Sequence, residues 1–457
     1  MNGNHFEQLE NLIANLMQGT RIPSIAILVM KDGKEIYSKA IGSRSLEGNV
    51  PATIKTIYGI GSVTKSFTCL ALLQLAEQGK LNIKDPIDKY LDFKLQKTTN
   101  KITIHHLMSH SSGIANLGAA TVLIARKSNL KETYVPMSTF DDFLLHVNNA
   151  KTEIIAEPGE RYFYLNSGYI LLGKLIEKVS GMKFEDYIKQ NILIPLNMQT
   201  ACFTESDYEQ IEDRMTAYYS EKEELRAVKH PFDELIYAAG GLICSVNDLR
   251  NYIQMYLDKG KFNGKQFMKS EDITKMFNPY VTVPPLFFGK QGYGYGWMET
   301  KDFFGETMIQ HGGSTAVSSA YISLIPEKNI GVIIMGNSGN SQGALLSQAI
   351  LAILLGKNPF NEHPVLLLEQ KLKLFPGSYQ TYKGLYKIEI EKKGPILYLI
   401  DKENDIKNPL IPNNNEPNDF TFFVPQGNYN FQVEFLVDKS SNKITLLYER
   451  NAFHKIN

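Results

Sequence analysis

Apolar residues recur at helical spacing over residues 5–18, and a short apolar run follows at residues 25–30. Recurrence at i, i+3 and i+4 is typical of an amphipathic helix, whereas a short apolar run bounded by turn residues is typical of a buried strand. Asp32-Gly33 separates this run from a second strand-like segment at residues 35–41, and Asp-Gly is a strong hairpin signal. The chain is therefore predicted to open with a helix followed by a β-hairpin.

Helical spacing dominates the middle of the chain. Residues 62–78 carry apolar positions at helical intervals and end at Gly79, a residue type favoured just after a helix. The same pattern recurs at residues 167–179 and 246–257. Strand-like segments return at residues 292–300, 307–310, 316–325 and 330–335, before a last apolar helix at 343–355. Strands at both ends with helices inserted between them predict a discontinuous α/β domain with a helical lobe.

The pattern changes after residue 357. Residues 358–370 contain Asn-Pro and His-Pro pairs and are predicted to be a linker. Beyond the linker, short alternating segments separated by turn residues predict an all-β barrel or sandwich. The predicted domains are residues 1–357, with sheet halves 1–58 and 290–357 around a helical lobe at about 59–289, and residues 371–457.

Composition narrows the classes of partner. Lys and Arg together number 48, and so do Asp and Glu, so the net charge is zero and no general attraction to nucleic acid or to an anionic membrane is expected. The longest apolar run, at residues 344–355, is shorter than the ~20 residues that span a bilayer. The first ten residues lack the basic and apolar stretches of a signal peptide. We expect a cytoplasmic protein.

A serine and a lysine three residues apart mark the start of the predicted helix at 62–78. Ser62 follows a glycine-containing loop, and Lys65 lies one helical turn further on the same face. A desolvated Lys65 would have a lowered pKa and could accept the Ser62 proton. Ser-x-x-Lys also begins at Ser128, Ser180 and Ser440, so the spacing alone is equally typical of a helix cap with a solvated lysine.

Two further motifs carry groups that suit the same chemistry. Tyr164 could relay a proton and Asn166 could hydrogen-bond a substrate amide, although an aromatic residue beside a helix cap is often only packed there. His311 could supply a hydrogen-bond donor or partial positive charge. Gly312 and Gly313 permit close approach of a ligand to a strand edge, where the next backbone N–H can point into the site.

In this order the motifs resemble those of the serine β-lactamase and penicillin-binding-protein superfamily, in its class C-like peptidase and esterase branch. The segment His106 to Gly113, together with Pro158-Gly159-Glu160 and Gly292 to Trp297, is similar to further landmarks of that branch. The resemblance covers residues 5–356 and implies an α/β fold in which an antiparallel sheet is flanked by helices. The C-terminal module resembles the lipocalin-like β-barrel that some of these peptidases carry.

The resemblance also implies roles. Ser62 would be the acylated nucleophile, with Lys65 as proton acceptor and Tyr164 as proton shuttle; whether lysine or tyrosine is the principal base stays open. Asn166 would orient the substrate. The backbone N–H groups of Ser62 and Ser314 would form the oxyanion hole.

One departure bears on the substrate. Typical relatives carry lysine where this chain has His311, and that lysine binds a substrate carboxylate, so efficient penicillin hydrolysis is not expected. His106 and His110 have the spacing of a helical zinc pair but lack an adjacent glutamate, and we expect neither metal nor cofactor. The leading hypothesis is a serine hydrolase of small amides or peptides, including ones with D-residues. A carboxylesterase and a non-catalytic binding protein are the alternatives, and a homo-oligomer is left open.

Overall fold

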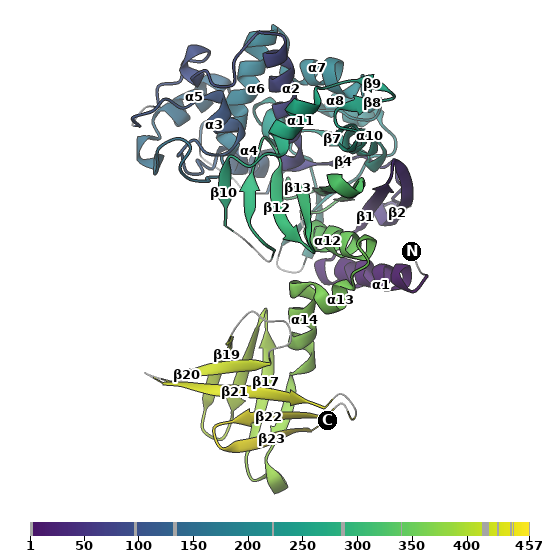
Figure 1. Ribbon diagram of the computed structural model, residues 1–457, viewed down its shortest axis with the longest axis vertical. Coiled ribbons are helices and arrows are strands. Elements are labelled where there is room, and N and C mark those ends of the chain that lie inside the picture. The colour runs from purple at the N-terminus through teal and green to yellow at the C-terminus, as the bar shows by residue number, and fades with distance from the viewer. Residues whose placement is uncertain are drawn as a thin grey trace. The chain divides into compact units, whose positions relative to one another are not determined.

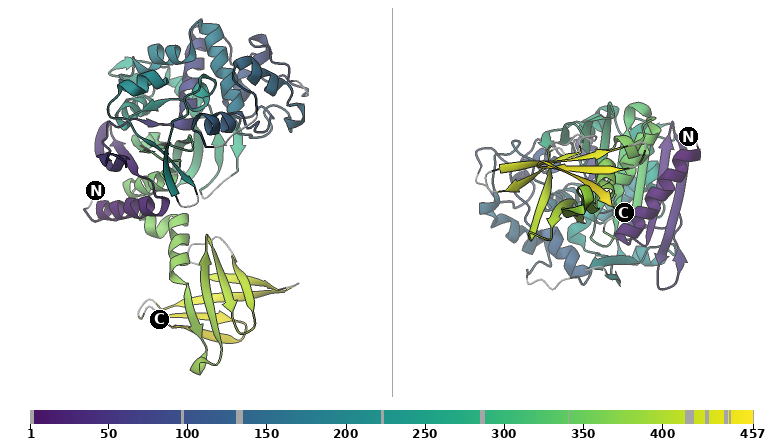
Figure 2. Two further views of the ribbon diagram at one scale, coloured as in Figure 1. Left: turned by 180° about the vertical axis from the view of Figure 1, so that it is seen from behind. Right: turned by 90° about the horizontal axis from the view of Figure 1, so that it is seen from below.

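The structure is a computed structural model that divides the chain into two compact units, Met1–Leu355 and Gly356–Asn457. The described residues are 3–95, 98–130, 135–221, 224–284, 288–339, 341–413, 420–426, 429–438, 441 and 443–456. Figures 1 and 2 show a mixed α/β first unit and a second unit dominated by strands.

The first unit is built on a nine-stranded antiparallel sheet whose strands come from both ends of that unit. Strand β1 (Ser24–Lys31) pairs with β15 (Ile330–Gly336), so that Ala26 lies opposite Met335. The strand order is β10 (Val281–Val283), β11 (Gln291–Tyr293), β12 (Met298–Phe303), β13 (Glu306–Ser314), β14 (Ser319–Ile325), β15, β1, β2 (Lys34–Ser45) and β3 (Val50–Pro51). The predicted α/β fold with an antiparallel sheet is confirmed.

Both faces of the sheet centre are covered. Every residue of β15 is buried, and because side chains alternate between the two faces of a strand, each face must be packed. Helix α12 (Gly343–Leu354) packs on β15 and against α1 (Gly3–Thr20), and α10 (Val246–Leu257) packs on β15 and β1. Figure 1 shows α1 and α12 together on one side and the remaining helices of the unit on the other.

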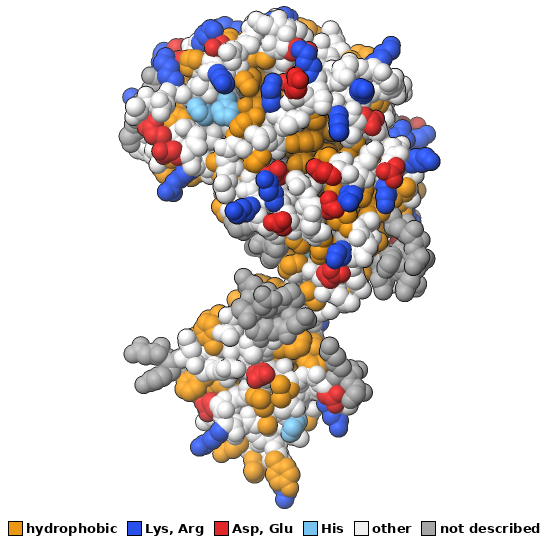
Figure 3. All heavy atoms as spheres, in the orientation of Figure 1, with side chains coloured by type: hydrophobic (Ala, Val, Ile, Leu, Met, Phe, Trp, Pro, Cys, Tyr) orange, Lys and Arg blue, Asp and Glu red, His pale blue; other side chains and the backbone are white. Residues whose placement is uncertain are grey.

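The helical lobe is organised around three helices that contact one another. Helix α2 (Thr64–Glu77) packs against α6 (Asn166–Ser180) and α9 (Tyr237–Gly240), and nearly all of its side chains are buried. The other helices of the lobe are α3 (Ile104–Met108), α4 (Ala119–Lys127), α5 (Phe140–Asn148), α7 (Phe184–Ile188), α8 (Glu205–Gln210) and α11 (Ser270–Phe277). On the face shown in Figure 3, basic and acidic side chains are interspersed over this unit.

Two strand predictions differ from the structure. Residues 292–300 form two strands rather than one, because the chain turns at Gly296 with φ +71° and meets the backbone of α2 at Ser66. The segment His311 to Ser314 belongs to β13 itself and is not a connection between strands. This second difference places the motif on a strand that runs beside Ser62.

The second unit is a closed barrel of eight antiparallel strands preceded by two helices. Its interior is filled by apolar side chains; Phe375 stacks on Phe435 with 4.0 Å between ring centroids. The elements are α13 (Pro359–Glu362), α14 (Pro364–Leu374), β16 (Gly377–Gln380), β17 (Lys387–Lys393), β18 (Ile396–Asp401), β19 (Ile406–Pro412), β20 (Thr421–Gln426), β21 (Tyr429–Val437), β22 (Ile444–Tyr448) and β23 (Asn451–Ile456). Across the described residues of both units, no helix has the length and apolar character that a bilayer crossing requires.

Candidate active site

Ser62 lies at a point where two backbones touch. It occupies a short 3-10 turn, Gly61–Val63, that leads directly into α2, and its side chain is only partly buried. A Cβ added to Gly61 would lie 2.5 Å from the backbone nitrogen of Ser314, and one added to Gly313 would lie 2.7 Å from the nitrogen of Ser62. Only glycine allows this approach, which brings the end of β13 against the serine turn.

Lys65 is fully buried one helical turn after Ser62. Its Nζ lies 3.1 Å from Ser62 Oγ, 2.7 Å from Asn166 Oδ1 and 2.6 Å from the carbonyl oxygen of Ala239. In the described part of the chain, no carboxylate forms a salt bridge with Lys65. Burial without a counter-charge penalises the ammonium form and lowers the pKa of Lys65 to about 7.

The partners of Lys65 fix the direction of its lone pair. A neutral amine has two N–H groups and one lone pair, and the oxygens of Asn166 and Ala239 can only accept hydrogen bonds. Both N–H groups are therefore used on these two oxygens, and the lone pair is left for the hydroxyl of Ser62. This arrangement suits removal of the serine proton.

Tyr164 lies beside the same serine and lysine. Its hydroxyl interacts with Ser62, and Lys65 Nζ lies 4.9 Å from the centre of its ring. Burial raises the pKa of Tyr164 above its usual value, so the phenol stays protonated at neutral pH. In this state it can donate a proton and cannot act as the first base.

The surroundings of His311 favour its uncharged form, whereas the sequence suggests either a hydrogen-bond donor or a partial positive charge at this position. It is buried on β13, and burial lowers its pKa to about 3. Its Nδ1 donates to the carbonyl oxygen of Gly312 at 2.7 Å, and its Nε2 accepts from the hydroxyl of Tyr293 at 2.9 Å. Both ring nitrogens are thus engaged within the protein, which leaves neither a cation nor a free donor for a substrate carboxylate.

The structure brings most of the predicted residues together, and two of them offer the site only their backbone. Ser62, Lys65, Tyr164 and Asn166 are joined by the contacts above, and the Gly313–Ser314 backbone borders them. The Cα of Gly312 faces the ring of Tyr321, and the hydroxyl of Ser314 donates to the carbonyl oxygen of Gly339. Only the backbone of these two residues is therefore available to the site.

Sequence reasoning missed two residues of this site. Ala239 supplies the carbonyl oxygen that accepts from Lys65, and His110 bonds to the backbone beside Tyr164. Ala239 precedes two glycines, Gly240 and Gly241, but no sequence pattern indicates that a main-chain oxygen is the functional group. The sequence spacing of His110 suggests only a metal pair with His106 and gives no indication of its contact with the Tyr164 segment.

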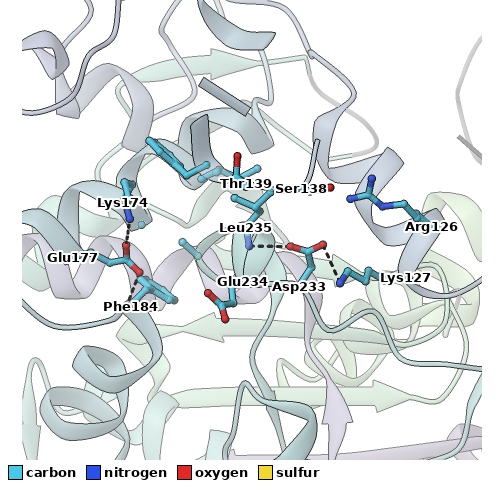
Figure 4. Close-up of a pocket in the computed structure, with 14 residues that line it drawn as sticks. Arg126, Lys127, Ser138, Thr139, Lys174, Glu177, Phe184, Asp233, Glu234 and Leu235 are labelled. Atoms are coloured by element: carbon cyan, nitrogen blue, oxygen red, sulfur yellow. Dashed lines mark hydrogen bonds and ion pairs between the residues drawn. The ribbon is translucent and has the colours of Figure 1, made fainter. Parts of the chain in front are cut away.

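A cavity of about 740 Å³ lies elsewhere in the helical lobe (Figure 4). Its described lining includes neither Ser62 nor Lys65. Four charged side chains of its wall pair with each other: Lys174 with Glu177 at 2.8 Å and Lys127 with Asp233 at 3.7 Å. This cavity is therefore separate from the group of residues around Ser62.

Two family models match the chain. The model described as beta-lactamase matches residues 9–356, and the model described as Pab87 octamerisation domain matches residues 359–454. The expected lipocalin-like domain is not supported, since the barrel matches a different description and its interior is filled by side chains. The predicted all-β barrel or sandwich is confirmed as a closed barrel, which has eight strands.

Solved structures and curated proteins agree with these matches. The octameric penicillin-binding protein homologue from Pyrococcus abyssi is 38% identical, with a TM-score of 0.89 over 98% of this chain and 100% of that one. A class C beta-lactamase, 20% identical with a TM-score of 0.63 over 77% of this chain and 96% of the other, shows the fold alone. Protein flp of Staphylococcus aureus (strain MW2) is 28% identical over 340 residues, or 72% of this chain and 63% of its own length. The chain thus spans less than two thirds of that relative.

Proposed function

The chain belongs to the β-lactamase family, and from this premise we propose that it is a serine hydrolase that works through an acyl-enzyme on Ser62. The observation that carries the proposal is the environment of Lys65. A buried amine with a pKa of about 7, whose two N–H groups are held by carbonyl oxygens, directs its lone pair at the serine hydroxyl. A catalytic base works best when its pKa lies near the operating pH.

The proposed acylation step uses Lys65 as base and Tyr164 as acid. Ser62 Oγ attacks the substrate carbonyl carbon while its proton passes to Lys65 Nζ. The bond from that carbon to the leaving nitrogen or oxygen then breaks, and the leaving atom takes the proton of Tyr164. Lys65 restores the proton that Tyr164 has given, so the acyl-enzyme forms with both groups in their starting states.

Deacylation reverses these proton movements. Water attacks the acyl carbon and gives up a proton through Tyr164 or Lys65, and Ser62 Oγ regains a proton as the carboxylic acid leaves. In both steps the developing oxyanion would be held by the backbone N–H groups of Ser62 and Ser314. Donors placed at such a position are worth about 10²–10³ in rate.

The substrate class follows from His311 and Tyr164. Since His311 offers no charge or free donor, we propose substrates that need no carboxylate at this position, such as neutral amides and peptides, including those with D-residues. A protonated Tyr164 suits an amine leaving group, which departs only once it is protonated. The alkoxide leaving group of an ester needs this proton less. A carboxylesterase is therefore the alternative, and a comparison of amide and ester substrates distinguishes it from an amidase.

The decisive test is covalent labelling. Incubation with a fluorophosphonate followed by mass spectrometry should place one adduct on Ser62, and Ser62→Ala should abolish it. A folded protein that takes up no acylating probe would refute the mechanism and leave a binding role. Turnover of D- and L-aminoacyl anilides against p-nitrophenyl esters then decides between amidase and esterase.

We also propose that the chain assembles with copies of itself through the barrel unit. The support is the match of residues 359–454 to an octamerisation domain and the likeness, at 38% identity, to an archaeal protein described as octameric. Mass determination by light scattering or native mass spectrometry tests this part of the proposal separately from the chemistry.

A further inference from the structure

We propose that His110 is a positioning residue for Tyr164, acting through two hydrogen bonds to the backbone on either side of that tyrosine. The inference rests on the proposed function, because it assigns His110 to the proton donor of that mechanism. It adds a residue from the α3–α4 connection to a site otherwise built from α2, α6, α9 and β13.

The two hydrogen bonds bracket Tyr164. The N–H of Phe163 donates to the carbonyl oxygen of His110 at 2.9 Å, and the N–H of Leu165 donates to His110 Nδ1 at 3.0 Å. The imidazole ring also lies against the ring of Tyr164, with 4.2 Å between centroids. One residue thus holds the main chain before and after Tyr164 and packs on its side chain.

The second hydrogen bond requires a neutral imidazole in one tautomer. Because Leu165 N–H is a donor, Nδ1 must present its lone pair, and the ring proton must sit on Nε2. A protonated imidazole has no lone pair to offer, so it would break the contact. The site keeps the ring neutral: His110 is fully buried, and burial together with the nearby Lys65 and His311 holds its pKa well below the usual value.

Aromatic rings surround the imidazole of His110. Its described neighbours are the rings of Tyr162, Tyr164, Tyr169 and Tyr293. Within the described residues, Nε2 is buried without a hydrogen-bond partner. A buried donor without a partner is unfavourable, and an apolar side chain at this position would not carry that cost. The hydrogen bond that Nδ1 accepts from Leu165 N–H is the contact that an apolar packing residue could not make.

The backbone at His110 is held in an unfavourable conformation. Its φ is +55°, in the left-handed region that non-glycine residues adopt only at a cost. The turn is fixed on one side by α3 and α6, since the hydroxyl of Tyr169 donates to the carbonyl oxygen of Met108 at 2.6 Å. Such strain persists where neighbouring contacts over-determine it, and here those contacts lead to the Tyr164 segment.

The test compares substitutions that keep or remove the acceptor. Asparagine can place Oδ1 near the position of Nδ1 and tolerates positive φ, whereas phenylalanine keeps a ring and removes the acceptor. We expect His110→Phe to lower kcat for a D-alanine p-nitroanilide about 10- to 100-fold with KM nearly unchanged, since small misplacements of catalytic groups have effects of that size. His110→Asn should retain most of the wild-type kcat.

A double-mutant cycle shows whether the effect passes through Tyr164. In a Tyr164→Phe background, His110→Phe should change kcat less than about twofold, because the group it positions is already gone. A multiplicative loss in that background would overturn the inference, as would equal losses in the Asn and Phe variants. His146→Phe, which replaces a histidine of α5 outside the site, is the control and should leave kcat unchanged.

Two further measurements keep the outcomes distinct. If His110→Phe does not fold, the pair His110→Asn and His110→Gln replaces it, and only Asn should be active because Gln places its acceptor one bond too far. Fluorophosphonate labelling of wild-type Ser62 checks the premise. A labelled wild type with a fully active His110→Phe refutes the inference alone, whereas an unlabelled wild type refutes the proposed function and the inference with it.

Discussion

At the scale of single residues, the chemistry of this site depends on groups that are buried without a charged partner. Lys65, His110 and His311 are all buried. Loss of solvation lowers the pKa of each side chain and so favours its neutral form. A neutral lysine can act as a base and a neutral histidine can accept a hydrogen bond, so burial favours the roles proposed for these residues.

Lys65 predicts the pH dependence of acylation. The amine is active when it has lost its proton, so the rate of Ser62 labelling should rise as pH increases through about 7 and level off above it. Stopped-flow or quenched labelling with a fluorophosphonate between pH 5 and 9 measures this directly. A rate that falls over this range would contradict the assignment of Lys65 as base, and Lys65→Met should remove the rising limb.

Because His311 is neutral, we expect the protein to prefer neutral substrates over substrates with a carboxylate. Replacing it by lysine should raise kcat/KM for a substrate with a carboxylate beside the scissile bond, relative to its neutral amide, by about tenfold, the size of one hydrogen bond to a charged group. The measurement is the ratio of the two kcat/KM values in wild type and His311→Lys. A wild type that already prefers the carboxylate would contradict the neutral state of His311.

Some of this could be predicted from the sequence and some could not. The relation of Ser62 to Lys65 follows from helical spacing, because residues i and i+3 share a face. His311 hydrogen-bonds with the hydroxyl of Tyr293 from another strand, and the backbone beside Tyr164 hydrogen-bonds to His110 in a distant turn. Such long-range contacts leave no periodic signal in the chain.

At the scale of elements, the site forms where β13 approaches the start of α2. A Cβ on Gly313 would overlap the carbonyl oxygen of Ile60 and crowd the nitrogen of Ser62. The strand and the serine turn therefore share one rigid contact. The same need for space explains why the predicted strand 292–300 is broken, since Gly296 turns against α2 at a contact that sequence alone does not reveal.

Gly313→Ala should separate the two elements and weaken oxyanion stabilisation. We expect the rate of Ser62 labelling to fall about 100-fold, the usual cost of losing one oxyanion donor. Gly19→Ala is the matched control, because a Cβ there meets no atom within 4 Å and φ is not positive. Equal labelling rates in Gly313→Ala and wild type, at equal melting temperature, would show that the strand does not contribute a donor.

At the scale of the whole molecule, the second unit presents apolar side chains to solvent. We name Tyr382, Leu385 and Tyr386, between β16 and β17, the turn cluster; their exposed fractions are 75%, 71% and 58%. Figure 3 shows hydrophobic side chains gathered on the surface of this unit. Single exposed apolar residues are common, but a cluster on a unit matching an octamerisation domain favours contact with another copy.

Replacing the turn cluster by serines should lower the mass of the assembly in solution. The control replaces Ile396, Ile411 and Leu436, three apolar residues of the same barrel that are 41%, 38% and 45% exposed. Native mass spectrometry reports the mass, and circular dichroism reports the fold. An oligomeric wild type whose mass survives the first variant would exclude the turn cluster as an interface, whereas a monomeric wild type would refute self-assembly altogether.

The alternation of apolar and polar residues after residue 370 predicts strands, because successive side chains of a barrel strand point alternately inward and outward. It does not predict whether the interior is hollow. That depends on how Phe375, Tyr379 and Phe435 meet across the barrel, which the spacing of each strand does not encode.

The pairing of the end of β13 with the serine turn has a consequence for synthesis. Ser62 and Ser314 are about 250 residues apart in the chain. Strand β1 can pair with β15 only after β15 has been synthesised, which is later still. At about 5–20 residues per second, a ribosome needs more than ten seconds to deliver the second half of the site after the first. A nascent or prematurely ended chain therefore carries the proposed nucleophile and base without β13 beside them, so the proposed hydrolytic activity would begin only once the sheet has closed.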